Sequence, residues 1–388
     1  MHVVYVGAFG QQTGYAQACH DYLLALHRHG VSLEIWPIAP VVNVENRYEE
    51  LIPLLETRDK EPTHLVIHTV PAAAVPALDV FLPEVQNRAS SKVKAVLVTT
   101  WETDRLPPYL ADAVLGWYDE VIVPSGFCAE ALDDDEIVHV VPHCFDPAHW
   151  QRKNEPRDSD EYRFYSILNW GERKNPIGLL KAYLAEFSAE DNVSLTIKLP
   201  PGSNPRADVE ALYACLGYPI EEAPRLKFAM DSLTHDELVA FHSAHDCFVT
   251  AARGEGWNLP AFEALVLGNK LISPAWGGHS EFAPDFPRYQ SIDYSLTPVI
   301  VPPQPGQSFS FGEAVLKTFE QKAPNGLTIR QSWCEPNLDH LRFAMRAVTD
   351  APRLPYEYRQ EKYTYKHVAP LFVKALEGRS NDDETSIG

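Results

Sequence analysis

Two glutamates in a glycine-rich stretch have the residue type and spacing to recognise a ligand with many hydroxyls. Glu255 and Glu263 lie in Arg253–Leu265, which reads RGEGWNLPAFEAL. A carboxylate accepts hydrogen bonds from neighbouring hydroxyls, so one glutamate could hold a ribose and the other a sugar. Gly254 and Gly256 allow a tight turn and a close approach of the backbone to such a ligand. Alternatively, each glutamate taken alone serves as a cap or a dipole partner at a helix start.

The same stretch is predicted to open a helix directly after a strand. An apolar run at Cys247–Thr250 predicts the strand, and Pro260 suits the first turn of a helix, where its missing N–H is no loss. We expect Glu263 in that first turn, so that its carboxylate and that of Glu255 face one pocket. Amides at a helix start favour an anionic diphosphate or a sugar oxygen. The stretch therefore predicts a site for a phosphorylated sugar.

This pattern resembles the signature of retaining glycosyltransferase family 4, whose members have the GT-B architecture. The signature is a Glu, a glycine-rich aromatic turn and Leu-Pro, then a second Glu followed by Ala, and Glu255 and Glu263 match its spacing. Here Trp257 and Asn258 replace the usual Phe-Gly. The resemblance implies that Glu263 binds the ribose and Glu255 the transferred sugar. It also implies that sugar and phosphate are held by the main-chain amides of Gly256, Trp257, Asn258 and Leu259.

Two basic residues form a second candidate feature. The segment Leu168–Asn175, LNWGERKN, resembles the family's first strand and loop of the C-terminal domain, which carries basic residues against the diphosphate. Lys174 is the better match, and Arg173 stands beside it. Negative charge grows on the leaving group as the glycosidic bond breaks, and two cations can balance it without a metal. We expect no required metal, although Mg²⁺ could still bind the diphosphate in solution; a solvated loop is the alternative for the basic pair.

A glycine-bearing loop follows the first expected strand, Val3–Val6. Family members place such a loop near the donor phosphates, so the resemblance implies a donor contact at Gly14, with Gly10 as a weaker choice. A lone glycine loop also fits a dinucleotide-binding fold. A nicotinamide oxidoreductase is therefore an alternative, but no acidic residue suited to binding its ribose follows the second strand, although Glu34 lies within that strand.

The segment after Val98 reads TTWETD, where many relatives have a His in a Thr-x-His setting. Trp101 stands at the position of that His. We therefore expect His68, at the end of another strand, to contribute to catalysis instead; a histidine at the edge of the core is the alternative. Glu102 and Asp104 end a strand beside the expected cleft and are predicted, with Trp101, to bind acceptor hydroxyls. Capping of a nearby loop is the alternative for both carboxylates.

Apolar, β-branched runs alternate with helical patterns, which predicts parallel sheets covered by helices on both faces. The expected strands of the first half are Val3–Val6, Leu33–Trp36, His64–Ile67, Val93–Val98, Val121–Val123 and Val138–Val141. After a polar stretch, the pattern restarts with Phe164–Leu168, Ser194–Leu199, Arg225–Phe228, Cys247–Thr250 and Lys270–Ser273. The expected fold class is α/β, namely GT-B, with two Rossmann-like domains facing a deep cleft.

These patterns predict an N-terminal acceptor domain at 1–150 and a nucleotide-sugar donor domain at 151–355. A helical pattern at 356–378 is expected to return to the first domain, as in GT-B proteins, and the polar tail 379–388 is expected to be disordered. Residues 277–335 lack a regular pattern, which fits either a lid or acceptor loop or an inert surface excursion.

The composition of the 388 residues, 45% hydrophobic and 22% charged, is ample for two globular domains. The formal net charge of −20 repels nucleic acid and anionic membranes at long range, so a DNA acceptor would need a confined basic strip. The six scattered cysteines predict reduced thiols in a cytoplasmic protein. No stretch of the sequence is long and apolar enough to span a bilayer.

Taken with the resemblance, the residues predict a retaining glycosyltransferase that moves a hexosyl or pentosyl group from a nucleotide diphosphate sugar to a hydroxyl acceptor, such as a glycan or a small molecule. A UDP-sugar is favoured because of its frequency in the family, with a GDP-sugar next, and no further cofactor is expected. Three alternatives stay open: a phage-type transferase acting on modified DNA bases, a GT-B epimerase or phosphorylase, and a non-catalytic sugar-nucleotide binding protein.

Overall fold

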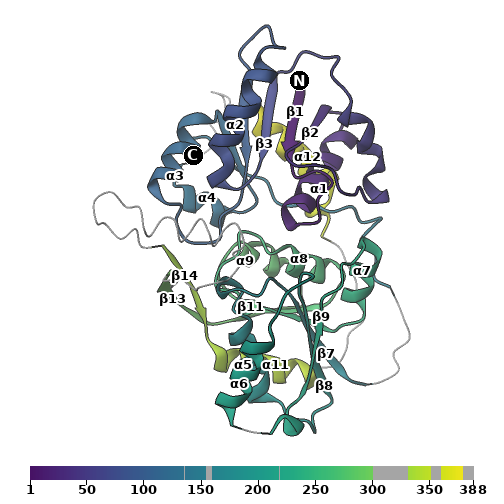
Figure 1. The fold of residues 1–388 in the computed structure, drawn as a ribbon, viewed down its shortest axis with the longest axis vertical. Coiled ribbons are helices and arrows are strands. Elements are labelled where there is room, and N and C mark those ends of the chain that lie inside the picture. The colour runs from purple at the N-terminus through teal and green to yellow at the C-terminus, as the bar shows by residue number, and fades with distance from the viewer. Residues whose placement is uncertain (135, 154–159, 218, 300–330, 351–359, 379–388) are drawn as a thin grey trace. The chain divides into compact units, whose positions relative to one another are not determined.

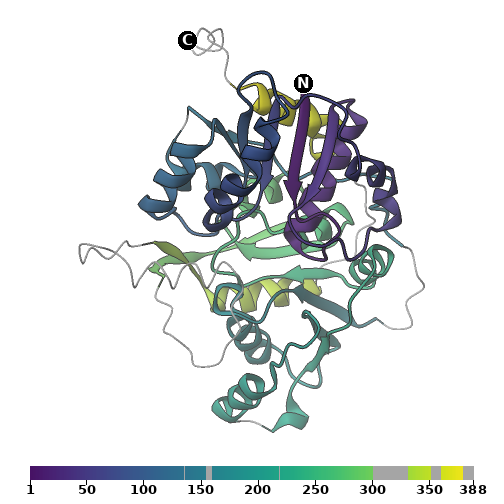
Figure 2. The same ribbon diagram turned by 45° about the horizontal axis from the view of Figure 1, so that its top comes forward.

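Two compact units make up the computed structural model, which describes residues 1–134, 136–153, 160–217, 219–299, 331–350 and 360–378 (Figure 1). Unit 1 comprises residues 1–149 and 360–388, and unit 2 comprises residues 150–359. Each unit contains a six-stranded sheet flanked by helices, as the views in Figures 1 and 2 show.

All strands of the sheet in unit 1 are parallel, in the order β2-β1-β3-β4-β5-β6. The strands are β1 His2–Gly7, β2 Ser32–Pro37, β3 His64–His68, β4 Lys94–Val98, β5 Glu120–Val123 and β6 Val138–Val140. The α-helices are α1 Gly14–Arg28, α2 Pro71–Gln86, α3 Pro108–Trp117, α4 Gly126–Leu132 and α12 Tyr365–Glu377. Short 3-10 helices are η1 Asn46–Leu55 and η5 Glu361–Tyr363.

Strand β1 shows why this sheet is covered on both faces. Every residue of His2–Gly7 is buried, whereas a half-exposed strand would alternate buried and exposed residues. Continuous burial is typical of parallel strands between two helical layers. The chain then enters α1 at Thr13, whose side chain accepts a hydrogen bond from the amide of Ala16 and so caps the helix.

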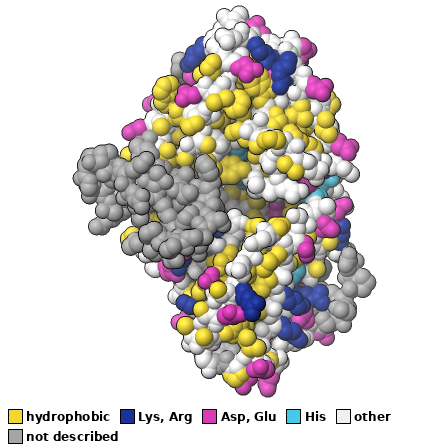
Figure 3. Space-filling model, viewed as in Figure 1, with side chains coloured by type: hydrophobic (Ala, Val, Ile, Leu, Met, Phe, Trp, Pro, Cys, Tyr) yellow, Lys and Arg dark blue, Asp and Glu magenta, His cyan; other side chains and the backbone are white. Residues whose placement is uncertain are grey.

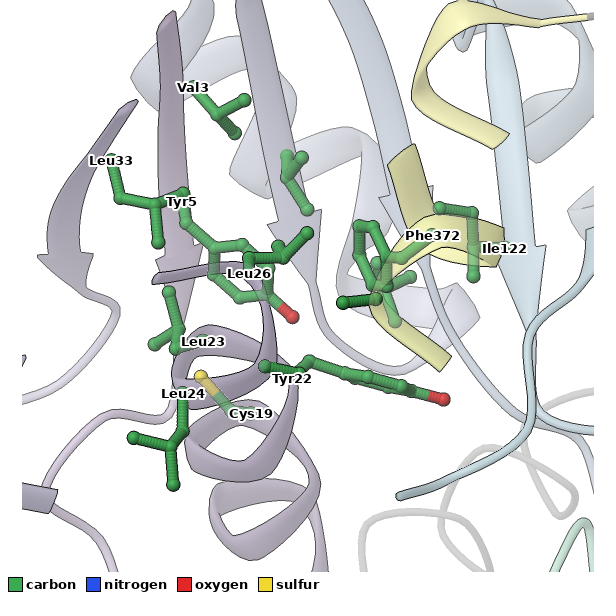
Figure 4. Close-up of a cluster of buried hydrophobic side chains, with 14 of the residues drawn as sticks. Val3, Tyr5, Cys19, Tyr22, Leu23, Leu24, Leu26, Leu33, Ile122 and Phe372 are labelled. Atoms are coloured by element: carbon green, nitrogen blue, oxygen red, sulfur yellow. The ribbon is translucent and has the colours of Figure 1, made fainter. Parts of the chain in front are cut away.

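The core of unit 1 joins residues from both ends of the chain. The ring of Phe372 on α12 lies 5.1 Å from that of Tyr22 on α1 and 6.4 Å from that of Tyr5 on β1, measured between centroids (Figure 4). Burying a large apolar side chain contributes about 1.5–3 kcal/mol. Because these rings are buried, α12 belongs to the hydrophobic core of unit 1.

The sheet of unit 2 is also parallel, in the order β12-β11-β10-β7-β8-β9. The strands are β7 Tyr162–Ile167, β8 Val193–Lys198, β9 Arg225–Ala229, β10 Cys247–Val249, β11 Lys270–Pro274 and β12 Tyr289–Ile292. An antiparallel ribbon adds β13 Tyr294–Pro298 and β14 Ser332–Pro336. The helices are α5 Pro176–Glu186, α6 Arg206–Leu216, α7 His235–Ser243, α8 Leu259–Val266, α9 His279–Phe282 and α11 Leu338–Asp350, with the 3-10 helices η2 Glu172–Lys174, η3 Ile220–Glu222 and η4 Ala283–Asp285.

Each strand order contains a point at which the chain changes direction across the sheet. In unit 1 this point lies between β1 and β3, and in unit 2 it lies between β7 and β10. Loops that leave neighbouring parallel strands there run to opposite faces of the sheet, which opens a crevice at the carboxyl ends of the strands. The topology therefore directs attention to the loops after β1, β3, β7 and β10.

The structure confirms the expected fold class, since both halves contain parallel sheets with helices. Every strand expected from the sequence is present, with ends shifted by at most a few residues. Strand β12 and the ribbon β13–β14 were not expected, because exposed positions in β13 leave no alternation of apolar residues to read. The expected helix at 356–378 begins only at Tyr365, and residues 351–359 and 379–388 lie outside the described residues.

Among the helices of the described ranges, none has the length and apolar character needed to cross a bilayer.

Candidate functional site

The loops after β7 and β10 are joined by main-chain and side-chain hydrogen bonds. The amide of Arg253 donates to the carbonyl of Arg173 over 2.6 Å, and the Arg253 guanidinium donates to the carbonyl of Glu172 over 2.8 Å. Because β7 and β10 are neighbours, these bonds connect the two loops at the change of direction in the sheet. The predicted basic pair and the predicted glutamate motif are therefore parts of one structure.

Glu255 is the centre of this site. Its carboxylate is buried and lies between two cations: Lys174 Nζ is 2.5 Å from Oε1, and Arg173 Nη1 is 3.3 Å from Oε2. Arg173 Nη1 also donates to the carbonyl of Gly254 over 2.7 Å. The structure thus brings together the catalytic candidates Glu255, Lys174 and Arg173.

The electrostatics of this group favour a negatively charged ligand. Burial by itself raises the pKa of the Glu255 carboxyl, but the charges of Lys174 and Arg173 outweigh burial and lower it. Glu255 is therefore ionised at neutral pH. Two cations therefore lie beside this carboxylate at the carboxyl ends of β7 and β10.

The loop after β11 completes the surroundings of Glu255. The amide of Gly278 donates to the Glu255 carbonyl over 2.7 Å. Gly277 has φ +99°, and a Cβ atom there would lie 3.0 Å from the same carbonyl oxygen. Only glycine adopts this conformation without strain, so the closeness of the loop to Glu255 depends on it. On the other side, Arg253 forms an ion pair with Glu335 of β14, with Nε 2.7 Å from Oε2.

Helices α5 and α8 both start at this site, each from an unusual asparagine cap. Asn175 and Asn258 have positive φ values of 49° and 74°, and their side-chain oxygens accept from the amides of Gly178 and Ala261. The Nδ2 groups of both asparagines are buried and make no hydrogen bond to any described residue. The left-handed backbone explains why Asn258 can stand at this position, where the signature that the motif resembles has glycine, since asparagine tolerates that conformation best after glycine.

The remaining residues of the glutamate motif have different settings. The Trp257 side chain is buried, with its ring 4.6 Å from that of Phe282, so any donor contact must come from its main chain. Glu263 was expected in the first turn of α8, but it is the fifth residue of this helix, because the helix already begins at Leu259. Its Oε2 lies 3.3 Å from Nε2 of His242. Main-chain contacts of Gly256 and Leu259 with a donor stay predictions.

His279 is a residue of this region to which sequence reasoning gave no role. It is fully buried on α9, and its Nε2 donates to the carbonyl of Pro274 over 2.9 Å. Its Nδ1 has no hydrogen-bond partner among the described residues. Burial lowers the pKa of this imidazole, so it is neutral and Nδ1 is an acceptor. A single histidine carries no sequence signal for such a setting.

In unit 1, His68 ends β3 within a cluster of tyrosines. Its Nδ1 lies 2.8 Å from the hydroxyl of Tyr5, and the rings of Tyr15 and Tyr22 are 5.7 and 6.0 Å away. Burial, together with the neighbouring His143, lowers the pKa of His68 to about 3. His68 is therefore a neutral hydrogen-bonding group at neutral pH. Its catalytic role stays a prediction.

The predicted acceptor residues lie on the loop after β4. The Trp101 indole is buried, and its Nε1 donates to Thr103 Oγ1 over 2.7 Å and to the carbonyl of Arg105 over 2.9 Å. These bonds give Trp101 a role in holding the loop. Glu102 and Asp104 are partly exposed. Burial first and the charge of Glu102 second raise the pKa of Tyr15, so this carboxylate lies near the tyrosine cluster.

Gly14, the predicted phosphate-loop contact, is the first residue of α1 and is exposed. Gly10 has φ +75°, and its amide donates to Nε2 of His20 over 2.8 Å, which fixes the loop against α1. Within the described ranges, no three or more His, Cys, Asp or Glu side chains are grouped as metal ligands.

Together, the strand orders and helices of the two units define the GT-B fold of glycosyltransferases. The chain matches the solved structure of the Anabaena protein HepE in complex with UDP-glucose, with 13% identity, 97% and 99% of the two chains covered and a TM-score of 0.54. It also matches a glycosyltransferase from Rickettsia africae, with 11% identity, 97% and 98% coverage and a TM-score of 0.58. A third match is sucrose-phosphate synthase from Thermosynechococcus elongatus, with 13% identity, 96% and 97% coverage and a TM-score of 0.57.

At such low identity these likenesses establish the fold and nothing finer. No family model matches the sequence, and no curated protein matches it.

Proposed function

We propose that this protein is a retaining glycosyltransferase, related to family 4, that transfers a hexosyl or pentosyl group from a nucleotide diphosphate sugar to a hydroxyl acceptor. A UDP-sugar is the favoured donor, and a GDP-sugar is the second choice. The donor would bind to the domain at 151–355 and the acceptor mainly to the domain at 1–150.

One observation carries this proposal: Lys174 and Arg173 surround a buried, ionised Glu255 where β7 meets β10. Two neighbouring cations of this kind suit a diphosphate. The starts of α5 and α8 add partial positive charge at the same edge of the sheet. The unpartnered Nδ2 groups of Asn175 and Asn258 are further donors, although each would need a small movement to reach a ligand.

The reaction assigned to this site breaks the bond between the anomeric carbon and the diphosphate oxygen. A new bond forms between the anomeric carbon and the acceptor oxygen on the same face of the sugar, and the acceptor proton passes to the leaving diphosphate. Lys174 and Arg173 stabilise the charge that develops on the diphosphate, which makes a metal unnecessary for that task. Glu255 accepts hydrogen bonds from hydroxyls of the transferred sugar and thereby orients it.

The other candidates take supporting roles. Glu263 accepts hydrogen bonds from the ribose hydroxyls, and Gly14 lies against the donor phosphates. His68 forms hydrogen bonds as a neutral group near the reacting atoms. Glu102 and Asp104 accept hydrogen bonds from hydroxyls of the acceptor substrate. The buried indole of Trp101 acts on the acceptor only through the loop that it holds.

Two further considerations support the proposal. The structures with the same fold include HepE with UDP-glucose and a protein described as the lipopolysaccharide outer core galactosyltransferase WaaB, so UDP-sugars and galactosyl transfer occur among them. A cytoplasmic location is part of the proposal, since all six cysteines are free thiols.

A glycan or a small molecule is preferred to DNA as the acceptor. On the face drawn in Figure 3, the Lys and Arg side chains of the described residues form small separate groups, with Asp and Glu side chains among them. A DNA acceptor would require a basic strip, and its glycosylation would fall steeply with salt.

The test is a donor panel. Purified protein is incubated with UDP-, GDP-, ADP- and dTDP-sugars, without and with a mixture of glycan acceptors, and the released nucleotide diphosphate is measured. The same panel is run on Lys174→Ala, with Lys181→Ala as the matched control because Lys181 is exposed on α5 of the same unit.

We expect one donor to be turned over, and Lys174→Ala to reduce its turnover about 100-fold, as the loss of a charge-stabilising group does. The Lys181→Ala control keeps wild-type turnover. Donor binding without turnover under every acceptor would favour a non-catalytic binding protein, and turnover without any acceptor would favour an epimerase. No binding of any donor would refute the proposal.

A further inference from the structure

A row of buried polar side chains lies behind Glu263 in unit 2. His242 on α7 and Tyr165 on β7 have no exposed surface, and Asn269, which follows α8, is 1% exposed. Glu263 itself is 4% exposed. Burying polar groups is costly unless they are hydrogen-bonded. Each of these buried polar groups therefore needs a hydrogen-bond partner, and this need fixes which group donates and which accepts in each bond.

The series of bonds starts at Arg152, the third residue of unit 2. Arg152 Nη1 donates to Oδ1 of Asn269. Since arginine can only donate, the amide of Asn269 must present its oxygen to Arg152 and its nitrogen to the other side. That nitrogen, Nδ2, lies 2.6 Å from the hydroxyl of Tyr165 and 2.7 Å from the main-chain oxygen of His242.

The direction of the next two bonds follows. The oxygen of Tyr165 accepts from Asn269, so its single proton is directed at Nδ1 of His242, 2.7 Å away. Burial raises the pKa of Tyr165 well above its ordinary value, so the hydroxyl keeps this proton. We therefore assign Nδ1 of His242 as the acceptor. The ring proton then sits on Nε2, which faces Oε2 of Glu263 at 3.3 Å.

Other contacts hold this row in place. Arg152 also donates to the carbonyls of Leu267 and Ser243, 3.1 and 3.0 Å away, so one guanidinium joins the C-terminal ends of α8 and α7. A cation at this position satisfies carbonyls that a helix end leaves without partners. Trp150 packs edge-on toward the ring of His242, with centroids 6.4 Å apart. The helices that carry Glu263 and His242 are thus fixed to each other.

We propose that His242 is a positioning residue for donor binding: through its Nε2–H it orients the Glu263 carboxylate toward the ribose hydroxyls, and Arg152, Asn269 and Tyr165 set the tautomer that makes this bond. The inference rests on the proposed function, because it assumes that Glu263 binds the ribose. Hydrogen bonds from groups behind a binding carboxylate are a common means of holding it in one orientation.

Two conservative variants separate the two ring nitrogens of His242. The amide nitrogen of glutamine reaches the position of Nε2, so His242→Gln retains a donor for Glu263. The amide of asparagine reaches only the position of Nδ1, so His242→Asn removes that donor. His340→Asn is the matched control, because His340 lies on α11 and its side chain is 37% exposed.

The measurement is the binding of UDP and of 2′,3′-dideoxyuridine diphosphate, which lacks the ribose hydroxyls, by titration calorimetry. We expect wild type to bind UDP more tightly than the dideoxy compound. His242→Asn should weaken UDP binding about tenfold and leave binding of the dideoxy compound unchanged, because only the ribose contact is lost. His242→Gln should restore most of the affinity for UDP, and Glu263→Gln should abolish the preference for UDP.

The outcomes distinguish this inference from the proposed function. If wild type prefers UDP to the dideoxy compound but His242→Asn keeps that preference, the inference is wrong and the proposed function stands. If His242→Asn weakens both ligands equally, His242 has only a structural role. If wild type binds neither UDP nor GDP, ADP or dTDP, the proposed function fails and the inference fails with it.

Discussion

Both units contain a six-stranded parallel sheet, although the strand orders differ, and they place opposite chemistry where the chain changes direction across the sheet. In unit 2, between β7 and β10, Lys174 and Arg173 surround an ionised Glu255. In unit 1, between β1 and β3, His68 is a neutral imidazole hydrogen-bonded to Tyr5. Both strand orders create a crevice, so the difference lies in the side chains.

The pKa shifts show what this difference means. In unit 2 the neighbouring cations overcome burial and keep Glu255 charged, whereas in unit 1 burial keeps His68 and His143 neutral. A charged group surrounded by opposite charge suits a charged ligand, while a neutral cluster of tyrosine and histidine suits hydroxyls. We expect a phosphorylated ligand in unit 2 and an uncharged hydroxyl ligand in unit 1.

The largest effect is expected from removing the central charge of unit 2. Glu255→Ala should lower kcat/KM by about 100- to 1,000-fold, because a charged hydrogen-bonding partner of the transferred sugar is lost. Binding of UDP alone should be unchanged or tighter, since Lys174 and Arg173 lose a competing anion. Steady-state kinetics and titration with UDP check both effects. Glu210→Ala, on the exposed face of α6, is the control. If Glu255→Ala changes kcat/KM by less than threefold, Glu255 has no role in the proposed site.

The second effect concerns the neutral histidines of unit 1. Burial lowers the pKa of His68 and His143 to about 3 and that of His20 to about 4. An unfolded histidine titrates near pH 6.5, so the unfolded chain binds more protons below that pH than the folded chain does. The contribution of these histidines to the free energy of unfolding is therefore fully present above pH 6.5. It is lost as the pH falls toward their pKa values in the folded protein.

This loss should amount to about 1.4 kcal/mol per pH unit for each such histidine. Urea unfolding at pH 7.5, 6.5 and 5.5 measures this loss. His68→Asn, whose side chain can still accept a hydrogen bond from Tyr5, should reduce the slope of the free energy of unfolding against pH by the contribution of one histidine. His340→Asn should keep the wild-type slope. An unchanged slope in His68→Asn would mean that His68 is not neutral in the folded protein, and the contrast between the units would fail.

A smaller effect is expected at the loop after β11. Gly277→Ala combines a strained backbone at φ +99° with a methyl group 3.0 Å from the Glu255 carbonyl, which should cost about 1–3 kcal/mol of stability. Gly217→Ala is the matched control, because Gly217 also has positive φ, +71°, but no atom within 4 Å of the added methyl. Thermal unfolding and kcat/KM should both fall further in Gly277→Ala than in the control. Equal losses would show that the contact with Glu255 has no consequence.

The smallest effect tests whether Trp101 acts on an acceptor or only holds its loop. Trp101→Phe removes the hydrogen bonds from Nε1 to Thr103 and to Arg105, which should cost about 1 kcal/mol of stability with little change in kcat/KM. Chemical denaturation and kinetics with one acceptor provide the two readings. A large rise in KM for the acceptor, with stability unchanged, would support direct binding by the indole.

Much of the fold was predictable because parallel strands buried on both faces read as short apolar runs, as β1 illustrates. Strands without that signal were missed, as with the exposed β13, whose partner β14 is more than thirty residues away in the chain. The start of α12 was misplaced because residues 360–364 continue its helical composition, whereas the helix begins at Tyr365.

Candidate site residues could be chosen from the sequence where a motif gives the spacing, as for Glu255 and Glu263, or where charges adjoin, as for Arg173 and Lys174. The ion pairs that join these motifs depend on the neighbouring positions of β7 and β10, which no local pattern encodes. Likewise, the hydrogen-bond row from Arg152 to Glu263 assembles residues from β7, α7, α8 and two loops, so His242 and Asn269 had no recognisable signal in the sequence.

The central claim is that the cations beside Glu255 bind the diphosphate of a sugar nucleotide. The most direct measurement compares the affinities of UDP and uridine, and of GDP and guanosine, in wild type and in Lys174→Ala, with Lys181→Ala as control. The account predicts that one diphosphate binds wild type about 100-fold more tightly than its nucleoside and that Lys174→Ala removes most of this difference. An equal difference in wild type and Lys174→Ala, or no preference for either diphosphate over its nucleoside, would contradict it.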